Sequence, residues 1–447
     1  MPGISELNQE HTALEQNQHR AKAPHRTALS LFPQEYPRIG VFHNNTILGF
    51  EALSFRDTDE MSTVTIENIQ TRHNTFRHLR EDSAVCRIRR GYYARFHSSD
   101  KVPLWDLWQA VALSRVFASA ALARSERIFT GRSALLLHSI HTWVTNPNVE
   151  YWCEDGGRRT IPFASVKFQN MCVPPCAITL RSHKPHTVVR LPDGLAVESV
   201  ESAVVRIALK EEPLEAFVAA CMALHSLSDF SHFALEISRT RVEIARERLF
   251  AVLDDQLSHR NYAIAHSILA FADGGCDNIF EAAVLWVVRT LYSGEVVTQF
   301  EIYGRYGRYF GDIVIPALQL IIEADGVSKL SLPRSDGLSA EHAWMRRQQD
   351  LINLGWKIFR VSWADLEDFP ALRRAIASNL GVKRLPPSSE CARIWSVPSA
   401  ECDGPKRRIH TNRHRSTGFV GTVDQPDPGF GSRIPGLAHS PAALEQQ

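Results

Sequence analysis

The segment Gly311–Lys329, with the sequence GDIVIPALQLIIEADGVSK, constrains the fold of this chain more than any other stretch. Apolar residues that favour β-structure flank Pro316, which lacks a backbone donor, so the segment predicts a β-hairpin that turns at this proline. A four-residue loop starting there places Asp312 opposite Glu323. Asp325 lies two residues beyond Glu323 and therefore points to the same face. The hairpin brings three carboxyl groups together.

Carboxylates held this close must share a proton, recruit a basic side chain or bind a cation, because like charges on facing residues destabilise a sheet. A divalent cation is the strongest compensator, and magnesium favours one or two protein carboxylates together with water and phosphate oxygens. Asp312 and Glu323 are the predicted metal ligands. Lys329 follows the turn at Gly326 and can reach the same rim. This set of groups suits metal-dependent hydrolysis of a phosphodiester.

Helices on either side of the hairpin add two candidate residues. The segment that begins at Asn278 carries Glu281 three residues later, the spacing of a capping box. Glu281 can cap this helix, stand beside the metal, or do both. Downstream, Ser339 begins the helix SAEHAWMRRQQDLINL, which Gly355 ends, and WKIFRVSW follows as a parallel strand. Arg347 on that helix is a candidate phosphate contact.

Residues 62–95 read as a short helix, a turn, a second helix and the strand pair VCRIRRGYYARF. This order is that of a winged helix, in which Arg77 and Arg80 on the second helix contact DNA. The alternative is a small helical cap on the next domain.

Residues 102–235 form an α+β unit that starts with a long Ala/Leu-rich helix and returns to helical periodicity at EEPLEAFVAACMALHSL. Its cysteine and histidine side chains have irregular spacing, so we interpret them as ordinary loop residues rather than zinc ligands: Cys153, Cys172, Cys176, His183 and His186. Together with residues 240–382, which contain the hairpin, these units predict a mixed α/β fold.

Both ends of the chain are poor in apolar residues, so residues 1–61 are expected to form a flexible or irregular leader and residues 386–447 a disordered tail. The tail includes the basic run KRRIHTNRHR, which either binds phosphate or is simply solvated. The net charge of the chain is only +1, so attraction to nucleic acid has to come from local patches. Scattered cysteines, no signal segment and no apolar run of about 20 residues predict a cytoplasmic protein without a membrane span.

The order Glu281, Gln299, Asp312, EADGVSK, Arg347 and LGWKIFRVSWADL resembles the domain related to very-short-patch-repair endonucleases in the PD-(D/E)XK nuclease superfamily. The resemblance covers about residues 278–380. It implies a restriction-endonuclease-like mixed sheet flanked by helices that cuts DNA with magnesium or manganese, in DNA repair or phage defence. By position, Asp312 and Glu323 hold the metal, Asp325 assists, Lys329 is the basic catalytic group and Glu281 is the acid of the leading helix. The chain departs from the usual pattern in having Asp325 where a lysine is common.

The earlier units are similar to the winged-helix and antitoxin portions of AbiEi-type abortive-infection regulators, through IRRGYYARF, FTGRSALLLHSI and VVRLPDGLAVESVESAVVRIAL. This resemblance implies a DNA-binding regulator with a toxin partner. Three hypotheses therefore stand: a metal-dependent endonuclease, a non-enzymatic DNA-binding regulator that keeps the nuclease fold, and an interaction scaffold.

Overall fold

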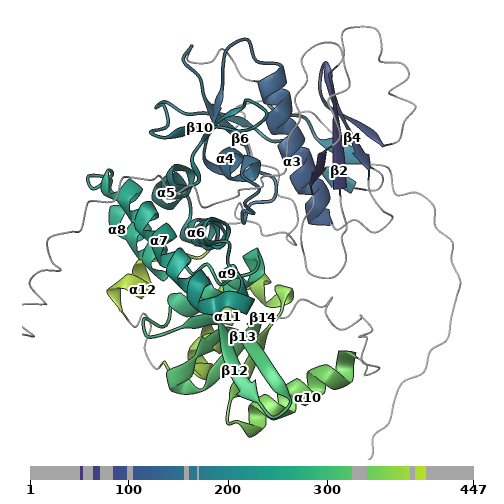
Figure 1. Cartoon of the computed structure of the whole chain (residues 1–447). Coiled ribbons are helices and arrows are strands. Elements are labelled where there is room, and N and C mark those ends of the chain that lie inside the picture. Colours follow the sequence, from purple (N-terminus) through teal and green to yellow (C-terminus); the bar gives the residue numbers. More distant parts are fainter. Residues whose placement is uncertain are drawn as a thin grey trace, which may run out of the picture.

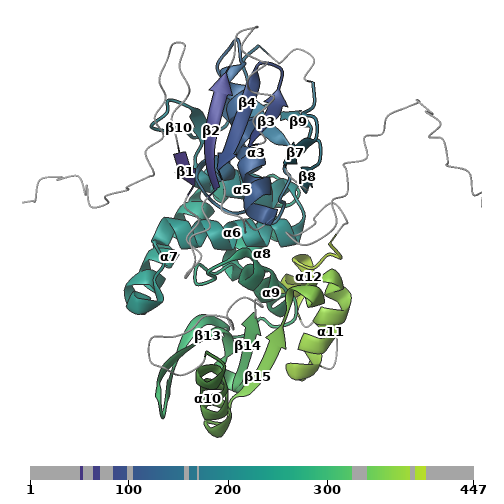
Figure 2. The same cartoon turned by 90° about the vertical axis from the view of Figure 1, so that its right-hand side faces the viewer.

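The chain is a mixed α/β protein, as predicted, with several sheets and packed helices. The structure, a computed structural model, describes residues 51–53, 64–70, 84–97, 104–155, 161–168, 171–324, 340–382 and 388–398. Figures 1 and 2 show one sheet at each end of the molecule, with a group of helices between them. None of the helices in these ranges is both long enough and apolar enough to cross a membrane.

The amino-terminal sheet has four strands in the order β1-β2-β4-β3: β1 (Glu51–Leu53), β2 (Val64–Gln70), β4 (Tyr92–His97) and β3 (Val85–Arg89). The predicted strand pair is confirmed as the β3–β4 hairpin. The predicted first helix of the winged-helix unit is wrong, because residues 64–70 form β2, an antiparallel partner of β4. Its VTIENIQ sequence is rich in β-branched residues, which favour strands. Arg77 and Arg80 lie outside the described residues.

The middle of the chain combines a small sheet with long helices. The long helix expected after residue 102 is α3 (Leu104–Ala121), and the helix expected at EEPLEAFVAACMALHSL is α6 (Pro213–Ser228). A five-stranded sheet, a two-stranded sheet and four further helices complete this part: β10 (Val188–Arg190), β11 (Ala196–Glu198), β5 (Ile128–Phe129), β6 (Val149–Trp152), β9 (Ile178–Leu180); β7 (Val166–Phe168), β8 (Met171–Val173); α4 (Gly131–Leu137), α5 (Val200–Lys210), α7 (Leu235–Asp254) and α8 (Tyr262–Phe271).

The carboxy-terminal sheet carries the hairpin predicted at Pro316. Its strand order is β12 (Val297–Gly304), β13 (Gly307–Ile315), β14 (Leu320–Ala324) and β15 (Lys357–Val361). Strands β12, β13 and β14 are antiparallel, and β15 is parallel to β14, as the crossover prediction required. The described residues of this part include the helices α9 (Ile279–Arg289), α10 (Ala340–Asn353), α11 (Phe369–Asn379) and α12 (Ser389–Arg393).

The two faces of this sheet have different partners. On one face, Ile313, Ile315 and Ile322 belong to the main core, which also contains the buried side of α9. On the other face, Ile302 and Ile321 pack with Leu351 of α10 in a small separate core. The acidic residues therefore lie in a sheet that is covered on both sides, where an unpaired charge is costly.

Aromatic contacts join the middle of the chain to the carboxy-terminal part. Trp143 stacks on Trp363 with ring centroids 6.4 Å apart, and Trp363 stacks on Phe280 at 4.5 Å. The Trp286 indole donates a hydrogen bond to the Ile394 carbonyl at 2.9 Å.

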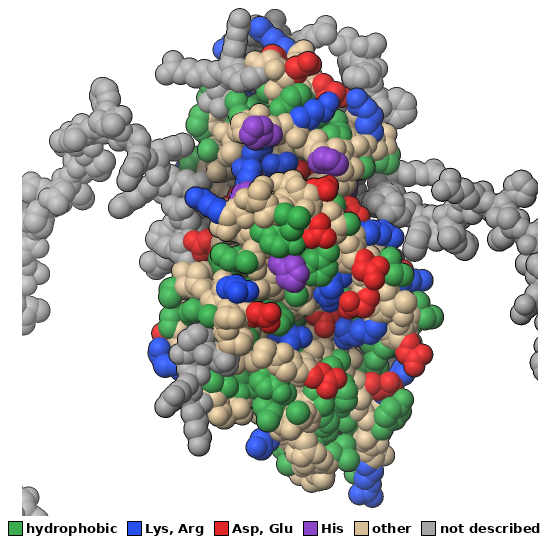
Figure 3. Space-filling model, turned by 90° about the vertical axis from the view of Figure 1, so that its left-hand side faces the viewer, with side chains coloured by type: hydrophobic (Ala, Val, Ile, Leu, Met, Phe, Trp, Pro, Cys, Tyr) green, Lys and Arg blue, Asp and Glu red, His purple; other side chains and the backbone are tan. Residues whose placement is uncertain are grey.

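Figure 3 shows one face of the molecule, on which basic and acidic side chains are interspersed. Any attraction for an anion on this face depends on local groups.

Candidate functional site

The β13–β14 hairpin has the register that the sequence predicts. Val314 pairs with Ile321 and Ile315 with Leu320, and a short 3-10 turn at Pro316–Leu318 connects the strands. One further step in this register places Asp312 opposite Glu323. The two acids thus lie one residue beyond the last observed pair, Ile313 with Ile322.

Glu323 is buried, with only 3% of its surface exposed, and its charge is offset by arginine. Arg347 of α10 donates hydrogen bonds to Glu323 Oε1 at 2.8 Å and to Oε2 at 3.4 Å. The same guanidinium donates to the Phe310 carbonyl at 2.7 Å. On the other side, Arg360 of β15 is the register partner of Glu323. Of the three compensators that the sequence left open, the structure shows the basic side chain.

The pKa of Glu323 is raised above its usual value of 4.5, first by burial and then by the negative charge of Asp312. Arg347 and Arg360 act in the opposite direction. A negative charge on Asp312 thus favours the protonated form of Glu323.

Asp312 is less buried than Glu323 and is oriented by the backbone. Its Oδ2 accepts a hydrogen bond from the Ala324 amide at 2.9 Å. On the opposite side, Thr298 pairs with Ile313 and Phe300 with Gly311, so the intervening Gln299 lies level with Asp312. Gln299 has a positive φ of 46°, which interrupts the regular strand at this point. A row of polar residues, one from each strand, thus crosses the sheet: Gln299, Asp312, Glu323 and Arg360.

Glu281 caps the start of α9, as one of its two predicted roles required. Asn278 Oδ1 accepts hydrogen bonds from the amides of Phe280 and Glu281, both at 3.0 Å. Glu281 in turn accepts from the Asp277 amide and the Asn278 side chain, both at 2.8 Å. Gln299 donates a long hydrogen bond of 3.5 Å to Asp277, which links this cap to the polar row. A catalytic role for Glu281 stays a prediction.

Two of the predicted site residues, Asp325 and Lys329, lie outside the described residues. Within the ranges that the structure describes, no group of three or more His, Cys, Asp and Glu side chains could hold a metal. The candidate metal ligands among the described residues are therefore two carboxylates, Asp312 and Glu323, rather than a larger cluster. Such a pair fits magnesium or manganese, because both ions take oxygen ligands and magnesium needs only one or two protein carboxylates.

The cysteines of the middle unit do not gather with its histidines. Cys153 and Cys176 are buried free thiols, whereas Cys172 is exposed on β8. Cys176 lies beside the buried Arg115, and burial raises the pKa of its thiol. Cys172 therefore lies in a strand rather than in the predicted loop, and the interpretation that these residues do not bind zinc stays a prediction.

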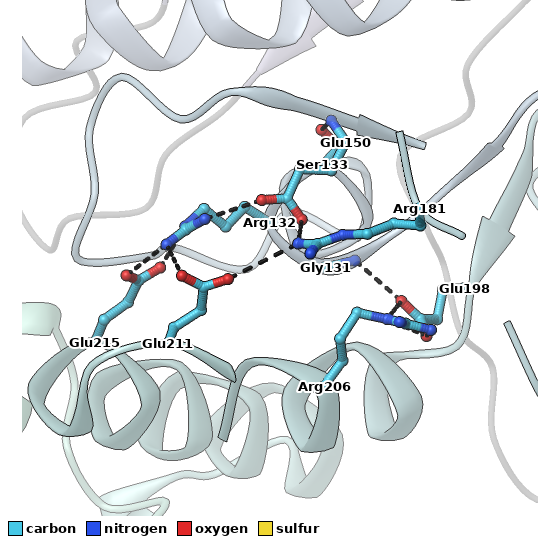
Figure 4. A network of polar contacts seen from close by, with 9 residues as sticks. All are labelled: Gly131, Arg132, Ser133, Glu150, Arg181, Glu198, Arg206, Glu211 and Glu215. Atoms are coloured by element: carbon cyan, nitrogen blue, oxygen red, sulfur yellow. Dashed lines mark hydrogen bonds and ion pairs between the residues drawn. The ribbon is translucent and has the colours of Figure 1, made fainter. Parts of the chain in front are cut away.

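A second charged cluster, in the middle of the chain, was not identified from the sequence (Figure 4). Its centre is Arg132, which forms ion pairs with Glu150 at 2.9 Å, with Glu211 at 2.7 Å and with Glu215. Arg181 reinforces it through an ion pair with Glu150 at 2.6 Å. Burial raises the pKa of the Glu215 carboxyl, whereas the pKa of Arg132 lies well above its usual range because its three glutamates outweigh the effect of burial. We refer to Arg132, Arg181, Glu150, Glu211 and Glu215 as the Arg132 network.

The Arg132 network is a structural cross-link. It joins the start of α4 to β6, to the segment after β9 and to the α5–α6 connection. Gly131, with φ of 54°, allows Glu150 to approach, since a Cβ atom at this position would lie 2.3 Å from Glu150 Oε2. Every acid in this network contacts an arginine. The sequence signal was the GRS motif before an apolar helix, but its partners are up to 83 residues away along the chain.

No protein-family model, curated protein or solved structure matches this chain.

Proposed function

We propose that this chain is a metal-dependent DNA endonuclease whose site is formed by Asp312 and Glu323. The observation that carries the proposal is that these two acids lie one residue beyond the last β13–β14 pair, Ile313 with Ile322, and that Glu323 is buried with its pKa raised by burial and by Asp312. Two carboxylates in a covered sheet cost free energy that apolar side chains there would not. A function that uses them accounts for that cost.

The chain's own residues have distinct roles in this proposal. Asp312 and Glu323 would hold magnesium or manganese, and Asp325, Lys329 and Glu281 are the further catalytic candidates. A bound ion would lower the pKa of water and offset charge on the scissile phosphate. The Ala324 amide fixes the orientation of Asp312 through its hydrogen bond. Arg347 and Arg360 lie where their positive charge can favour a phosphate beside Glu323.

The resemblance to repair endonucleases supports DNA as the partner, as does the set of basic residues Arg77, Arg80 and Arg347. Membership of a phage-defence or repair system, the toxin partner and cytoplasmic location are part of the same proposal. These three parts of the proposal rest on the amino-acid sequence alone.

The test is cleavage of supercoiled plasmid by the full chain with magnesium, with manganese or with chelator. We expect nicking by the wild type only with a metal, and a loss of at least about 100-fold in Asp312→Asn and Glu323→Gln, since even outer-shell changes at metal sites cost about 10- to 100-fold. Glu243→Gln is the matched control, because Glu243 also pairs with an arginine but is exposed on α7. Equal nicking by wild type and Asp312→Asn would overturn the proposal.

The ion pair between Arg347 and Glu323 favours a second candidate, a DNA-binding regulator of AbiEi antitoxin type that keeps this fold without turnover. An arginine that neutralises Glu323 removes the need for a metal. Such a regulator binds DNA equally well in chelator and in magnesium, and it leaves the plasmid intact in both. Metal-dependent nicking that requires Asp312 excludes it.

A further inference from the structure

The tip of the β12–β13 hairpin exposes two large aromatic side chains. Figures 1 and 2 show this hairpin extending beside α10 at the end of the molecule opposite β2 and β4. Tyr303 is 73% exposed and Tyr306 is 57% exposed. Tyrosine rings of this size are usually at least half buried in a folded protein, so two of them at one turn are unusual.

Arginine side chains surround these rings. The Arg305 guanidinium lies 5.5 Å from the centre of the Tyr306 ring, and the Arg346 guanidinium of α10 lies 5.3 Å from the same ring. Arg308 is the register partner of Tyr303 and lies 5.1 Å from the Phe310 ring. Aromatic faces and guanidinium groups therefore alternate over one short turn. We refer to Tyr303, Arg305, Tyr306, Arg308 and Arg346 as the hairpin tip.

The charge of this region is positive. Glu301 is the nearby strand acid, and it is paired with Arg308 at 3.0 Å. Asp350 is buried beneath the turn and accepts hydrogen bonds from the Tyr309 hydroxyl at 3.0 Å and the Tyr306 amide at 3.3 Å. Arg305 and Arg346 remain to attract an anion.

The turn is held in one conformation before any ligand binds. Gly304 pairs with Gly307, whose φ of 144° is accessible to glycine but strained for other residues. The hydrogen bonds to Asp350 attach the turn to α10, so Tyr306 and Arg346 keep their relative positions. A preorganised surface of this kind loses little conformational entropy on binding.

We propose that the hairpin tip binds an unpaired nucleic-acid strand. The exposed faces of Tyr303 and Tyr306 stack on bases, and Arg305 and Arg346 contact the phosphates. Stacking on a side chain requires bases whose faces are accessible, which a closed duplex does not offer in its interior. Deoxyribose and ribose strands share this chemistry, so both are probes in the test.

The biological use of this binding rests on the proposed function, because an endonuclease would use the hairpin tip to hold its substrate. Strand β13 runs from Gly307 at the tip to Asp312, roughly 16 Å at about 3.3 Å per residue. Arg346 also precedes Arg347, which contacts Glu323. A strand held at the tip can therefore extend toward the acidic pair within a few nucleotides, which predicts a substrate with an unpaired segment beside the cut.

The test is fluorescence anisotropy of labelled oligothymidylate, oligouridylate and a blunt duplex of equal length, with the full chain in chelator so that no cleavage occurs. We expect tighter binding of the unpaired strands than of the duplex. Tyr303→Ala and Tyr306→Ala should each weaken binding about fivefold or more, whereas Tyr303→Phe and Tyr306→Phe keep the rings and bind within about twofold. Loss of Arg305 or Arg346 should flatten the salt dependence, by about 0.7 in the slope of log K against log salt for each lost phosphate contact.

Glu243→Gln is the matched control for this experiment, because Glu243 is exposed on α7 and belongs neither to the hairpin tip nor to the acidic pair, so this variant should leave binding in chelator unchanged. Binding without cleavage in the wild type would count against the nuclease and leave the tip proposal intact. No binding of either unpaired strand, equal affinity for the duplex, or alanine and phenylalanine variants that bind alike would overturn the tip proposal. Any of these outcomes would favour a protein partner as the ligand of the exposed tyrosine rings.

Discussion

The Arg132 network and the Asp312–Glu323 pair both contain buried glutamates, but the groups that contact their acids differ. In the network, Glu150 contacts two arginines, Arg132 and Arg181, and Glu215 is held by Arg132. At the pair, Arg347 contacts Glu323 while Asp312 raises the pKa of the same group. Arginine side chains thus hold the acids of the network, whereas at the pair an arginine holds Glu323 and a backbone amide holds Asp312. The pKa of a buried glutamate is raised in both regions.

The largest effect is expected from breaking the Arg132 network. Arg132→Met should lower the free energy of unfolding by about 3–5 kcal/mol, because it leaves buried glutamates without a counter-charge. Urea denaturation measures this change. Arg190→Ala is the control: it removes an exposed ion pair with Glu126 and should cost less than about 1 kcal/mol. Similar values for the two variants would show that the network does not stabilise the fold.

A smaller loss is expected at the acidic pair. Arg347→Met should lower the free energy of unfolding by about 1–3 kcal/mol without metal, since Arg360 still faces Glu323. Under the endonuclease proposal, magnesium should raise the melting temperature of this variant more than that of the wild type, because the ion replaces the lost positive charge. A double-mutant cycle with Glu323→Gln checks the coupling; additive effects would contradict a direct interaction between Arg347 and Glu323.

The pH dependence of stability separates the charged and neutral forms of Glu323. Its pKa in the folded chain is raised above 4.5, so the folded state keeps a proton that the unfolded state has lost. The stability that this proton provides is present at low pH and is lost as the pH rises above 4.5 through the folded pKa. Relative to Glu323→Gln, the wild type should lose about 1.4 kcal/mol for each unit of pKa elevation. Denaturant unfolding over a pH series tests this, and parallel curves would exclude the shift.

The smallest effect concerns the cap of α9. Asn278→Ala should cost about 1 kcal/mol, because two amides at the helix start lose their acceptor. Glu281→Gln tests the other role of that acid by plasmid cleavage and denaturation in parallel. If Glu281 only caps the helix, nicking per folded molecule stays at the wild-type rate. A large loss of nicking with little loss of stability would assign it to the site.

Short-range features of the carboxy-terminal sheet could be predicted from the sequence. Pro316 defines the turn, and the four-residue loop that starts there sets the register Val314 with Ile321 and Ile315 with Leu320. Asn278 and Glu281 identify the start of α9 by their spacing. Such features depend on residues close together in the chain, where turn geometry and hydrogen bonding leave few alternatives.

The segment Val64–Gln70 shows where that reasoning stops. A helix was expected there, yet the segment is a strand because β4 supplies its backbone partners. Strand propensity depends on what lies alongside, and a neighbour more than twenty residues away is not visible in a local pattern.

The sequence by itself determined that two acids meet across a hairpin, because that meeting needs only a turn and a register. Only the tertiary structure decided what surrounds them: Arg347 of α10 forms an ion pair with Glu323, and Arg360 is its register partner on the neighbouring parallel strand. The Arg132 network likewise draws on segments that are distant in the chain. Charge compensation in a buried site depends on distances in space, which folding sets through the packing of whole helices and sheets.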